Sequence, residues 1–324
     1  MTGLPFLTRM SPLGHIASAT GTLTESITGM TTTTRIHALL EKERTIVFPG
    51  VYDALGAKLV ERAGFPLTFV SGYSVAASHL GLPDFGYLTQ TEVVAVARRV
   101  CASVGIPIII DADTGYGNAL IVIRTVNELI EAGAAGMFLE DQIWPKRCGH
   151  MKGKRVIPIE EHVQKIRAAV DTRRNRDFFI VARTDARQVT GLDDAIRRCR
   201  RYREAGADAL FVEGPRSVEE LATIARELPP PLVANMLEGG VTPLLTKEEL
   251  ESLGFQLIVC PLTALYASAK AMQEIFGLLK TAGTTRAAMD RLLPFQQFHD
   301  IIDLDGYYAL DERYRTPDDT PGSS

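Results

Sequence analysis

The chain has 324 residues, a length typical of one large α/β barrel or of two smaller domains. Apolar residues make up 46% and charged residues 23%, a composition that excludes a largely disordered chain. The net charge is -4 and no apolar run is long enough to span a bilayer, so we expect neither nucleic acid nor a membrane as a partner.

The two ends of the chain lack the periodicity of helices or strands. Residues 1–34 are rich in Thr and Ser and contain a single acid, Glu25, so we expect a flexible leader. A mitochondrial or plastid transit peptide is the alternative, but such peptides are usually richer in Arg. The four cysteines lack C-x-x-C spacing, which favours a reducing compartment, and we expect a cytoplasmic protein. Residues 316–324 are expected to form a disordered tail, which leaves a single domain over residues 35–315.

Short apolar, β-branched runs alternate with segments of helical period along this domain. The eight predicted strands are Thr45–Pro49, Leu67–Ser71, Ile106–Asp111, Ala135–Glu140, Phe178–Arg183, Ala209–Glu213, Leu232–Asn235 and Gln256–Pro261. The predicted helical segments are Asp53–Ala63, Thr91–Val104, Val122–Ala132, Ile159–Val170, Leu192–Ala205, Val218–Glu227 and Lys247–Leu253. Such alternation is typical of parallel strands joined by crossover helices. Eight units predict a closed (β/α)8 TIM barrel, with a doubly wound sheet as the alternative.

Polar residues stand at the ends of six predicted strands. They are Ser71, Asp111 with Asp113, Glu140 with Asp141, Arg183 with Asp185, Glu213, and Asn235. In a barrel these strand ends converge on one face, where the active sites of such barrels lie. Helix capping explains one such residue but not six. The pattern therefore indicates an enzyme.

The segment Ile108–Gly117 (I-I-I-D-A-D-T-G-Y-G) is an apolar strand that leads into two carboxylates. On a strand, Asp111 and Asp113 would point to the same side and repel each other unless a cation lies between them. Oxygen ligands suit Mg²⁺, so we expect a magnesium site with Glu140 and Glu213 in its outer shell. The alternative is that Asp113 only caps the next turn.

The segment Glu140–Arg155 is a long connection with the composition of a mobile lid. Its five basic residues are Lys146, Arg147, Lys152, Lys154 and Arg155. This charge suggests a substrate with several negative charges. The neighbouring cations are expected to lower the pKa of the Cys148 thiol, which could then act as nucleophile or proton donor. The alternative is a solvated basic loop with an incidental cysteine.

Two further strand ends suggest carboxylate binding. Arg183 is placed to bind a carboxylate through two parallel hydrogen bonds, and Asn235 adds a neutral donor. The sequence contains no glycine-rich nucleotide-binding motif, so we expect no nucleotide cofactor.

Several motifs together resemble the isocitrate lyase/phosphoenolpyruvate mutase superfamily over about residues 35–315. They are P-G-V-Y-D-A-L-G-A-K (49–58), V-S-G-Y-S (70–74), D-A-D-T-G-Y-G (111–117) and E-D-Q (140–142). The stretch K-R-C-G-H (146–150) resembles the signature of the superfamily's carbon–carbon lyases, whereas branches acting on carbon–phosphorus bonds lack this cysteine. Around this signature the chain is similar to the petal death protein, 2,3-dimethylmalate lyase and methylisocitrate lyase group.

The resemblance implies a Mg²⁺-dependent barrel, with Mn²⁺ as an alternative metal. It also implies a homotetramer in which neighbouring subunits exchange C-terminal helices. The amphipathic segment Phe295–Ile302 agrees with this exchange, because its apolar face needs a partner. By resemblance, Asp111 would bind the metal directly, and Asp113, Glu140 and Asp84 would bind it through water.

The resemblance further implies roles for the residues around the metal. Substrate carboxylates would be bound by Ser71, Gly72, Tyr73, Gly149, His150, Arg183, Asn235 and Thr263. The catalytic residues would be Cys148, Lys146, His150, Arg183 and Glu213, with Cys148 as the general acid.

The reaction implied is retro-aldol cleavage of a 2-alkylmalate-type dicarboxylate to a 2-oxo acid, such as pyruvate, and a second carboxylate. The first alternative is a 2-methylisocitrate lyase, which acts on a tricarboxylate; the bulky Trp144 argues against it by narrowing the pocket. Cys148 argues against a phosphoenolpyruvate mutase or phosphonopyruvate hydrolase. Thr263 argues against an oxaloacetate hydrolase, since those enzymes tend to have serine at that position.

Overall fold

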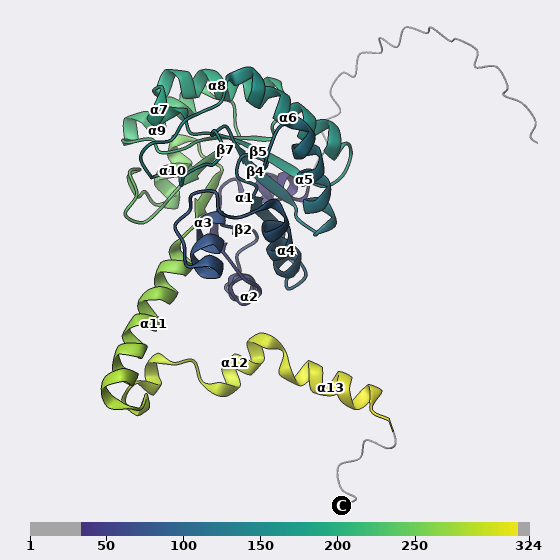
Figure 1. The fold of residues 1–324 in the computed structure, drawn as a ribbon, viewed down its shortest axis with the longest axis vertical. Coiled ribbons are helices and arrows are strands. Elements are labelled where there is room, and N and C mark those ends of the chain that lie inside the picture. Colours follow the sequence, from purple (N-terminus) through teal and green to yellow (C-terminus); the bar gives the residue numbers. More distant parts are fainter. Residues whose placement is uncertain (1–33, 317–324) are drawn as a thin grey trace, which may run out of the picture. The chain divides into compact units, whose positions relative to one another are not determined.

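The computed structural model describes residues 34–316 (Figure 1). Eight parallel strands follow one another around a closed barrel, and β8 pairs with β1 through Ile46–Leu257 and Phe48–Val259. The strands are β1 (Ile46–Val51), β2 (Thr68–Val70), β3 (Ile108–Asp111), β4 (Gly136–Glu140), β5 (Phe179–Thr184), β6 (Ala209–Val212), β7 (Leu232–Asn235) and β8 (Leu257–Cys260). The predicted barrel is confirmed and the doubly wound sheet is excluded.

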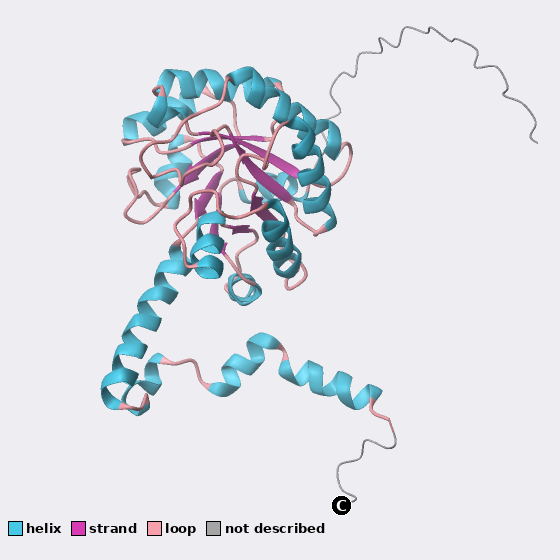
Figure 2. Cartoon of the chain, viewed as in Figure 1, coloured by secondary structure: helices cyan, strands magenta, loops and turns pink. Residues whose placement is uncertain are grey.

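Most of the helices surround this barrel, whereas α11 leads away from it, as Figure 2 shows. The helices are α1 (Arg35–Glu43), α2 (Ala54–Arg62), α3 (Gly72–Val75), α4 (Gln90–Cys101), α5 (Ala119–Glu131), α6 (Ile159–Arg173), α7 (Ala186–Val189), α8 (Leu192–Glu204), α9 (Val218–Glu227), α10 (Lys247–Leu253), α11 (Thr263–Ala282), α12 (Phe295–Ile302) and α13 (Leu304–Tyr314). A π-helical turn, Ala76–Leu80, and a 3₁₀ segment, Arg286–Arg291, complete the set. Within residues 34–316, every helix is too short or too polar to cross a membrane.

The sequence analysis missed the short elements that follow β2 and β5. The helices α3 and α7 have four residues each, too few for a 3.6-residue period to be recognised. The predicted leader and tail lie outside the described residues except at their inner ends. There, Thr34 is buried and caps α1.

Local sequence signals set the helix ends. At the start of α4, Thr89 and Glu92 form a capping box that satisfies backbone N–H groups. At the end of α10, Gly254 has φ +104°, a conformation that glycine adopts without a steric penalty. Such signals set where these helices begin and end between the strands.

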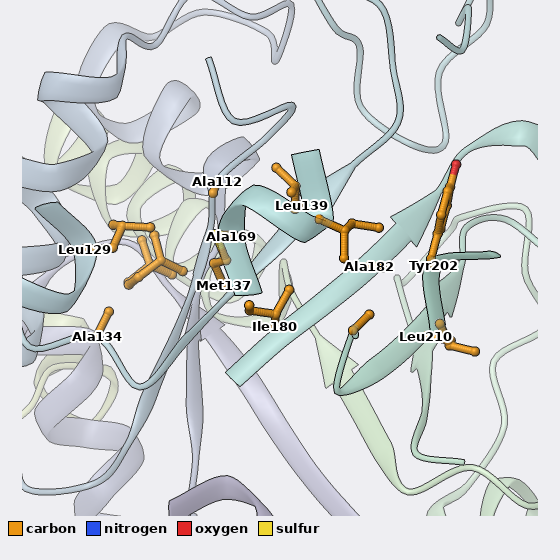
Figure 3. Close-up of a cluster of buried hydrophobic side chains, with 14 of the residues drawn as sticks. Ala112, Leu129, Ala134, Met137, Leu139, Ala169, Ile180, Ala182, Tyr202 and Leu210 are labelled. Atoms are coloured by element: carbon orange, nitrogen blue, oxygen red, sulfur yellow. The ribbon is translucent and has the colours of Figure 1, made fainter. Parts of the chain in front are cut away.

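The core has two layers. Inward-facing residues fill the barrel, among them Phe48, Phe69, Phe138, Phe179, Phe211 and Val259. Outward-facing residues pack under the helices: Met137 and Leu139 of β4 and Ile180 of β5 meet Leu129 of α5 and Ala169 of α6 (Figure 3). Each fully buried apolar side chain contributes about 1.5–3 kcal/mol. The layers therefore hold the strand ends, and the polar side chains on them, in a rigid frame.

The helix that follows β8, α11, departs from this packing. No residue of α11 is buried, and Met272, Phe276 and Leu279 are 49%, 61% and 44% exposed. On the strands beside it, the outward-facing residues Val47, Pro49, Ile258 and Cys260 line an open groove. An apolar helix and an apolar barrel face are thus both left without full cover.

Candidate active site

A cavity lies at the carboxyl ends of the strands. Most of the sequence-predicted site residues line it: Ser71, Tyr73, Asp84, Asp111, Lys146, Cys148, Gly149, His150, Arg183, Glu213 and Asn235. They come from the ends of five strands, β2, β3, β5, β6 and β7, or the loops that follow them, and from the segment after β4. The structure thus brings together residues that are up to 164 positions apart, from Ser71 to Asn235. This face of the barrel is where the sequence placed the active site.

The carboxylates predicted to hold a metal lie side by side. The two oxygens of Asp111 accept hydrogen bonds from the backbone N–H groups of Gly72, at 3.2 Å, and Asp113, at 3.2 Å. Asp113 has φ +48°, so the strand ends before it. The pair is therefore close because of a turn, and the predicted explanation by strand alternation is wrong.

Lys146 lies between two of these carboxylates. Its Nζ is 2.7 Å from Asp84 Oδ2 and 2.7 Å from Asp113 Oδ1, and its side chain is 3% exposed. Burial raises the pKa of Asp113 to about 7, although the ammonium of Lys146 favours the charged form. The ammonium group of Lys146 is thus paired with carboxylates of the protein itself. This corrects the expectation that the positive charge of the basic loop serves a substrate with several negative charges.

The four carboxylates fit a hydrated divalent cation. Asp84 and Asp113 share the ammonium group of Lys146, Glu140 Oε2 lies 3.3 Å from Arg183 Nη2, and Glu140 Oε1 is buried without a hydrogen-bond partner. Within residues 34–316, no three His, Cys, Asp or Glu side chains form a ready-made metal cage. Mg²⁺ commonly uses one or two carboxylates and completes its shell with water and substrate oxygens. The donor set therefore suits Mg²⁺ better than a metal that needs a full protein cage.

The connection after β4 folds over the cavity. Gln142 bridges its own loop, since its side chain donates to Arg147 O at 2.8 Å and accepts from Arg147 N at 3.1 Å. The backbone N–H of Cys148 donates to Asp84 O at 3.2 Å. These bonds place the Cys148 thiol above the metal-site carboxylates.

The environment of Cys148 differs from the predicted one. Burial raises the pKa of its thiol to about 11, and the neighbouring Lys146 does not compensate. The expectation of a lowered pKa is therefore wrong, because the side chain is removed from water and two acids, Asp84 and Glu213, also act on it. At neutral pH the group is a thiol, a proton donor.

Arg183, which also lines the cavity, is surrounded by acidic side chains. Its Nε and Nη2 donate to the two oxygens of Asp185 at 2.9 and 3.1 Å. Its Nη2 also lies 3.3 Å from Glu140 Oε2 and 3.4 Å from Glu213 Oε2. Asp185 thus occupies the Nε–Nη2 edge of the guanidinium. The predicted pair of hydrogen bonds from Arg183 to a substrate carboxylate cannot form through that edge. None of the contacts named here uses Nη1.

Glu213 joins Arg183 to the middle of the loop. Its Oε1 is 2.9 Å from His150 Nε2, and its oxygens accept from Asn235 Nδ2 at 3.2 Å. Burial alone would raise the pKa of Glu213, but Arg183 and His150 outweigh it and lower that pKa to about 2. Glu213 is thus a carboxylate that orients three neighbours.

Four predicted site residues do not line the cavity: Gly72, Asp113, Glu140 and Thr263. The first three contact residues that do line it, namely Asp111, Lys146 and Arg183. Thr263 is exposed and donates to Glu238. Trp144 is 40% exposed and packs against Tyr116, with 5.9 Å between ring centroids. The expectation that the indole narrows the pocket is therefore wrong, since Trp144 does not line it.

Apolar residues that the sequence analysis did not single out also line the cavity. Phe69, Phe138 and Phe211 form its floor, from β2, β4 and β6, and Leu237, Pro261 and Leu262 form one wall. In the sequence these residues look like ordinary core positions. Only the alternation of strand residues, with knowledge of which end faces the site, could have identified the floor.

Comparison with known proteins agrees with this geometry. The family described as phosphoenolpyruvate phosphomutase matches residues 36–279. The chain belongs to this family. The resemblance to the isocitrate lyase/phosphoenolpyruvate mutase superfamily is therefore confirmed.

Three relatives align with most of this chain and over most of their own length. A protein named carboxyvinyl-carboxyphosphonate phosphorylmutase, chloroplastic, from Arabidopsis thaliana is 54% identical over 285 residues, which cover 87% of this chain and 84% of the relative. The petal death protein of Dianthus caryophyllus is 50% identical over 296 residues, or 91% and 92%. The 2,3-dimethylmalate lyase of Eubacterium barkeri is 46% identical over 287 residues, or 89% and 99%. The prediction that this chain is a carbon–carbon lyase agrees with the name of the third relative.

Two solved structures show the same fold. A crystal structure of 2,3-dimethylmalate lyase, described as a member of the PEP mutase/isocitrate lyase superfamily, superposes with a TM-score of 0.82 at 35% identity, and covers 89% of this chain and 97% of that one. A phosphonopyruvate hydrolase in complex with oxalate and Mg²⁺ gives a TM-score of 0.78 at 30% identity, with 87% and 99% coverage. That neighbour binds Mg²⁺ together with oxalate, a small dicarboxylate.

Proposed function

We propose that this protein is a Mg²⁺-dependent lyase that cleaves a 2-alkylmalate-type dicarboxylate into a 2-oxo acid and a second carboxylate. The observation that carries the proposal is the position of Cys148, whose protonated thiol lines the same cavity as Asp111 and Arg183. A proton donor opposite a cation site is what carbon–carbon cleavage next to a carboxylate requires.

Two groups of residues would bind the two ends of the substrate, and we call them the two poles of the site. Asp111 would hold the metal directly, and Asp113, Glu140 and Asp84 would hold it through water. When bound there, Mg²⁺ supplies a Lewis acid for the C2 oxygen and its neighbouring carboxylate. At the other pole, His150, Asn235 and the Nη1 edge of Arg183 are placed to bind the second carboxylate.

The proposed step is a retro-aldol cleavage. The C2 hydroxyl loses its proton to a base, and the oxygen's electrons form the carbonyl of the 2-oxo acid as the C2–C3 bond breaks. The electron pair of that bond remains on C3, where the adjacent carboxylate delocalises it. Cys148 then gives its thiol proton to C3, which leaves as the second carboxylate product.

The apolar wall favours an alkylated substrate. Leu237, Pro261 and Leu262 line the cavity beside Tyr73 and carry no charge that would pair with a third carboxylate. An alkyl group on the malate skeleton would bury apolar surface there, at about 25 cal/mol per Å². The relative named 2,3-dimethylmalate lyase supports the same substrate class.

A coupled assay tests the proposal. Pyruvate release is followed with lactate dehydrogenase for 2,3-dimethylmalate, citramalate and 2-methylisocitrate, with Mg²⁺ and with EDTA. Release from the malates that EDTA abolishes supports the proposal. Preference for 2-methylisocitrate would replace the alkylmalate assignment, and no release from any of the three would overturn the lyase assignment.

We also propose that the protein assembles by exchange of α11 between copies. The exposed apolar side chains of α11 and the groove along Val47, Pro49, Ile258 and Cys260 are complementary surfaces that one chain leaves uncovered. Light scattering after size exclusion should give a homotetramer for the wild type and smaller species for Phe276→Asp. A monomeric wild type would contradict the exchange.

A further inference from the structure

Lys154 is the most completely buried charge of the segment after β4. Its side chain is 0% exposed, although its neighbours Lys152, Gly153 and Arg155 are all exposed. Its Nζ lies 2.7 Å from Asp185 Oδ1 and donates to the carbonyl of Gly149. A lysine is removed from water in this way only when its partners compensate for the lost hydration.

The same carboxylate also holds Arg183. Asp185 Oδ1 accepts from both Lys154 Nζ and Arg183 Nη2, and Asp185 Oδ2 accepts from Arg183 Nε at 2.9 Å. Both partners lower the pKa of Asp185 against the effect of burial, which keeps it a carboxylate. The carbonyl of Gly149 and the guanidinium of Arg183 are therefore fixed to one shared group.

Asp185 is itself held in place from behind. Its backbone N–H donates to Asp141 Oδ1 at 2.9 Å. Asp141 Oδ2 accepts from Thr184 Oγ1 and Tyr202 OH, both at 2.7 Å, and from Arg198 Nη1 at 3.1 Å. All of these groups are buried, so the carboxylate of Asp185 is an immobile anchor tied to α8.

We propose that Lys154 is a positioning residue that anchors the loop of residues 142–157 to Asp185 and so sets the distance between Gly149 and Arg183. The functional part of this inference rests on the proposed lyase function, because Gly149 and Arg183 lie at the carboxylate-binding pole. The anchor itself does not rest on it, since it is defined by contacts within the free protein.

The Lys154→Met variant tests the anchor cleanly. It removes the ammonium but leaves Asp185 paired with Arg183 through two hydrogen bonds, so no buried charge is left alone. Lys152→Met is the matched control: it removes the same charge from the same loop at an exposed position. Thermal unfolding of all proteins reports whether the fold is kept.

Hydrogen exchange of residues 142–157 gives a readout that needs no substrate. Loss of the charge-assisted bonds should speed exchange in this segment by about tenfold or more in Lys154→Met. In Lys154→Met, acrylamide should quench the fluorescence of Trp144, the single tryptophan of the chain, more strongly than in the wild type. Lys152→Met should match the wild type in both measurements. Equal protection in Lys154→Met and wild type would overturn the proposal.

A second measurement uses the unmodified protein and does not depend on any variant. Brief acetylation of the native wild type should modify Lys152 at least about tenfold faster than Lys154, since a buried, ion-paired amine reacts only after local opening. Labelling of both lysines at one rate would show that the anchor is absent.

Kinetics then test the functional part. With an alkylmalate substrate, Lys154→Met should lower kcat/KM by about 10- to 100-fold, with a rise in KM, because a misplaced carboxylate-binding pole weakens substrate and transition state alike. Faster loop exchange with unchanged kcat/KM would overturn the positioning role and keep the anchor. A wild type that turns over no alkylmalate would contradict the proposed function alone, and the exchange and labelling results would still decide the anchor.

Discussion

Gly149 lies directly against Arg183. A Cβ atom at Gly149 would stand 2.5 Å from Arg183 Nη2 and 2.5 Å from Glu213 Cγ, closer than non-bonded atoms approach. The loop therefore reaches its position over the cavity only because residue 149 has no side chain.

We expect Gly149→Ala to keep the fold but lose turnover. The methyl group must push the loop outward, and a displacement of about 1 Å at an active site can cost about 100-fold in rate. Steady-state kinetics and thermal unfolding measure the two effects. Gly105→Ala, where the nearest atom is Glu61 Oε1 at 3.4 Å, is the control and should behave as the wild type. Full activity of Gly149→Ala would show that the loop works in a different position.

Replacement of Cys148 by serine should abolish pyruvate release while the protein stays folded. A serine hydroxyl is a much weaker acid than a thiol, and general acid catalysis typically contributes about 10² to 10⁴ in rate. The coupled assay measures the loss, and Cys101→Ser on α4 is the control. Retention of turnover in Cys148→Ser would assign the proton to another donor.

Mg²⁺ should stabilise the folded protein. A ligand that binds only the native state contributes about 2.7 kcal/mol at a concentration of about 100 Kd. We therefore expect Mg²⁺ to raise the Tm, and Asp111→Asn to reduce this shift strongly. Asp171→Asn, which removes an exposed acid on α6, should retain the wild-type shift. Equal shifts in both variants would place the cation elsewhere.

His162 should make stability depend on pH. Burial, with the nearby charges of Lys165 and Arg198, lowers the pKa of His162 to about 3 from its ordinary 6.5. Below pH 6.5 the unfolded chain binds a proton at His162, whereas the folded protein does not. The free energy of unfolding therefore decreases as the pH is lowered from 6.5 to 3. Between pH 7.5 and 5 this amounts to roughly 2 kcal/mol, at about 1.4 kcal/mol per pH unit below 6.5.

Urea unfolding of His162→Leu at both pH values tests this origin. The variant should lose less stability than the wild type on acidification, by roughly the same 2 kcal/mol. His79→Leu, which changes an exposed histidine, should keep the wild-type dependence. Parallel losses in His162→Leu and the wild type would assign the dependence to other groups.

The sequence by itself determined the barrel and the outline of the site. Eight apolar runs alternated with helical segments, and the strands formed within two residues of the predicted bounds because strand and helix periods are local properties. The strand-end residues, from Ser71 to Asn235, reached one cavity because parallel strands in a barrel share a direction. The K-R-C-G-H stretch at 146–150 marked the loop that covers it.

Only the tertiary structure decided what the charged groups do. Lys146 and Lys154 look alike in the basic loop, yet one is paired with Asp84 and Asp113 and the other with Asp185. The fork of Arg183 is filled by a residue two positions away, and the thiol of Cys148 is protonated where sequence neighbours suggested a thiolate. The physical reason is that desolvation and Coulomb energies depend on groups that lie close in space, and those groups come from different strands.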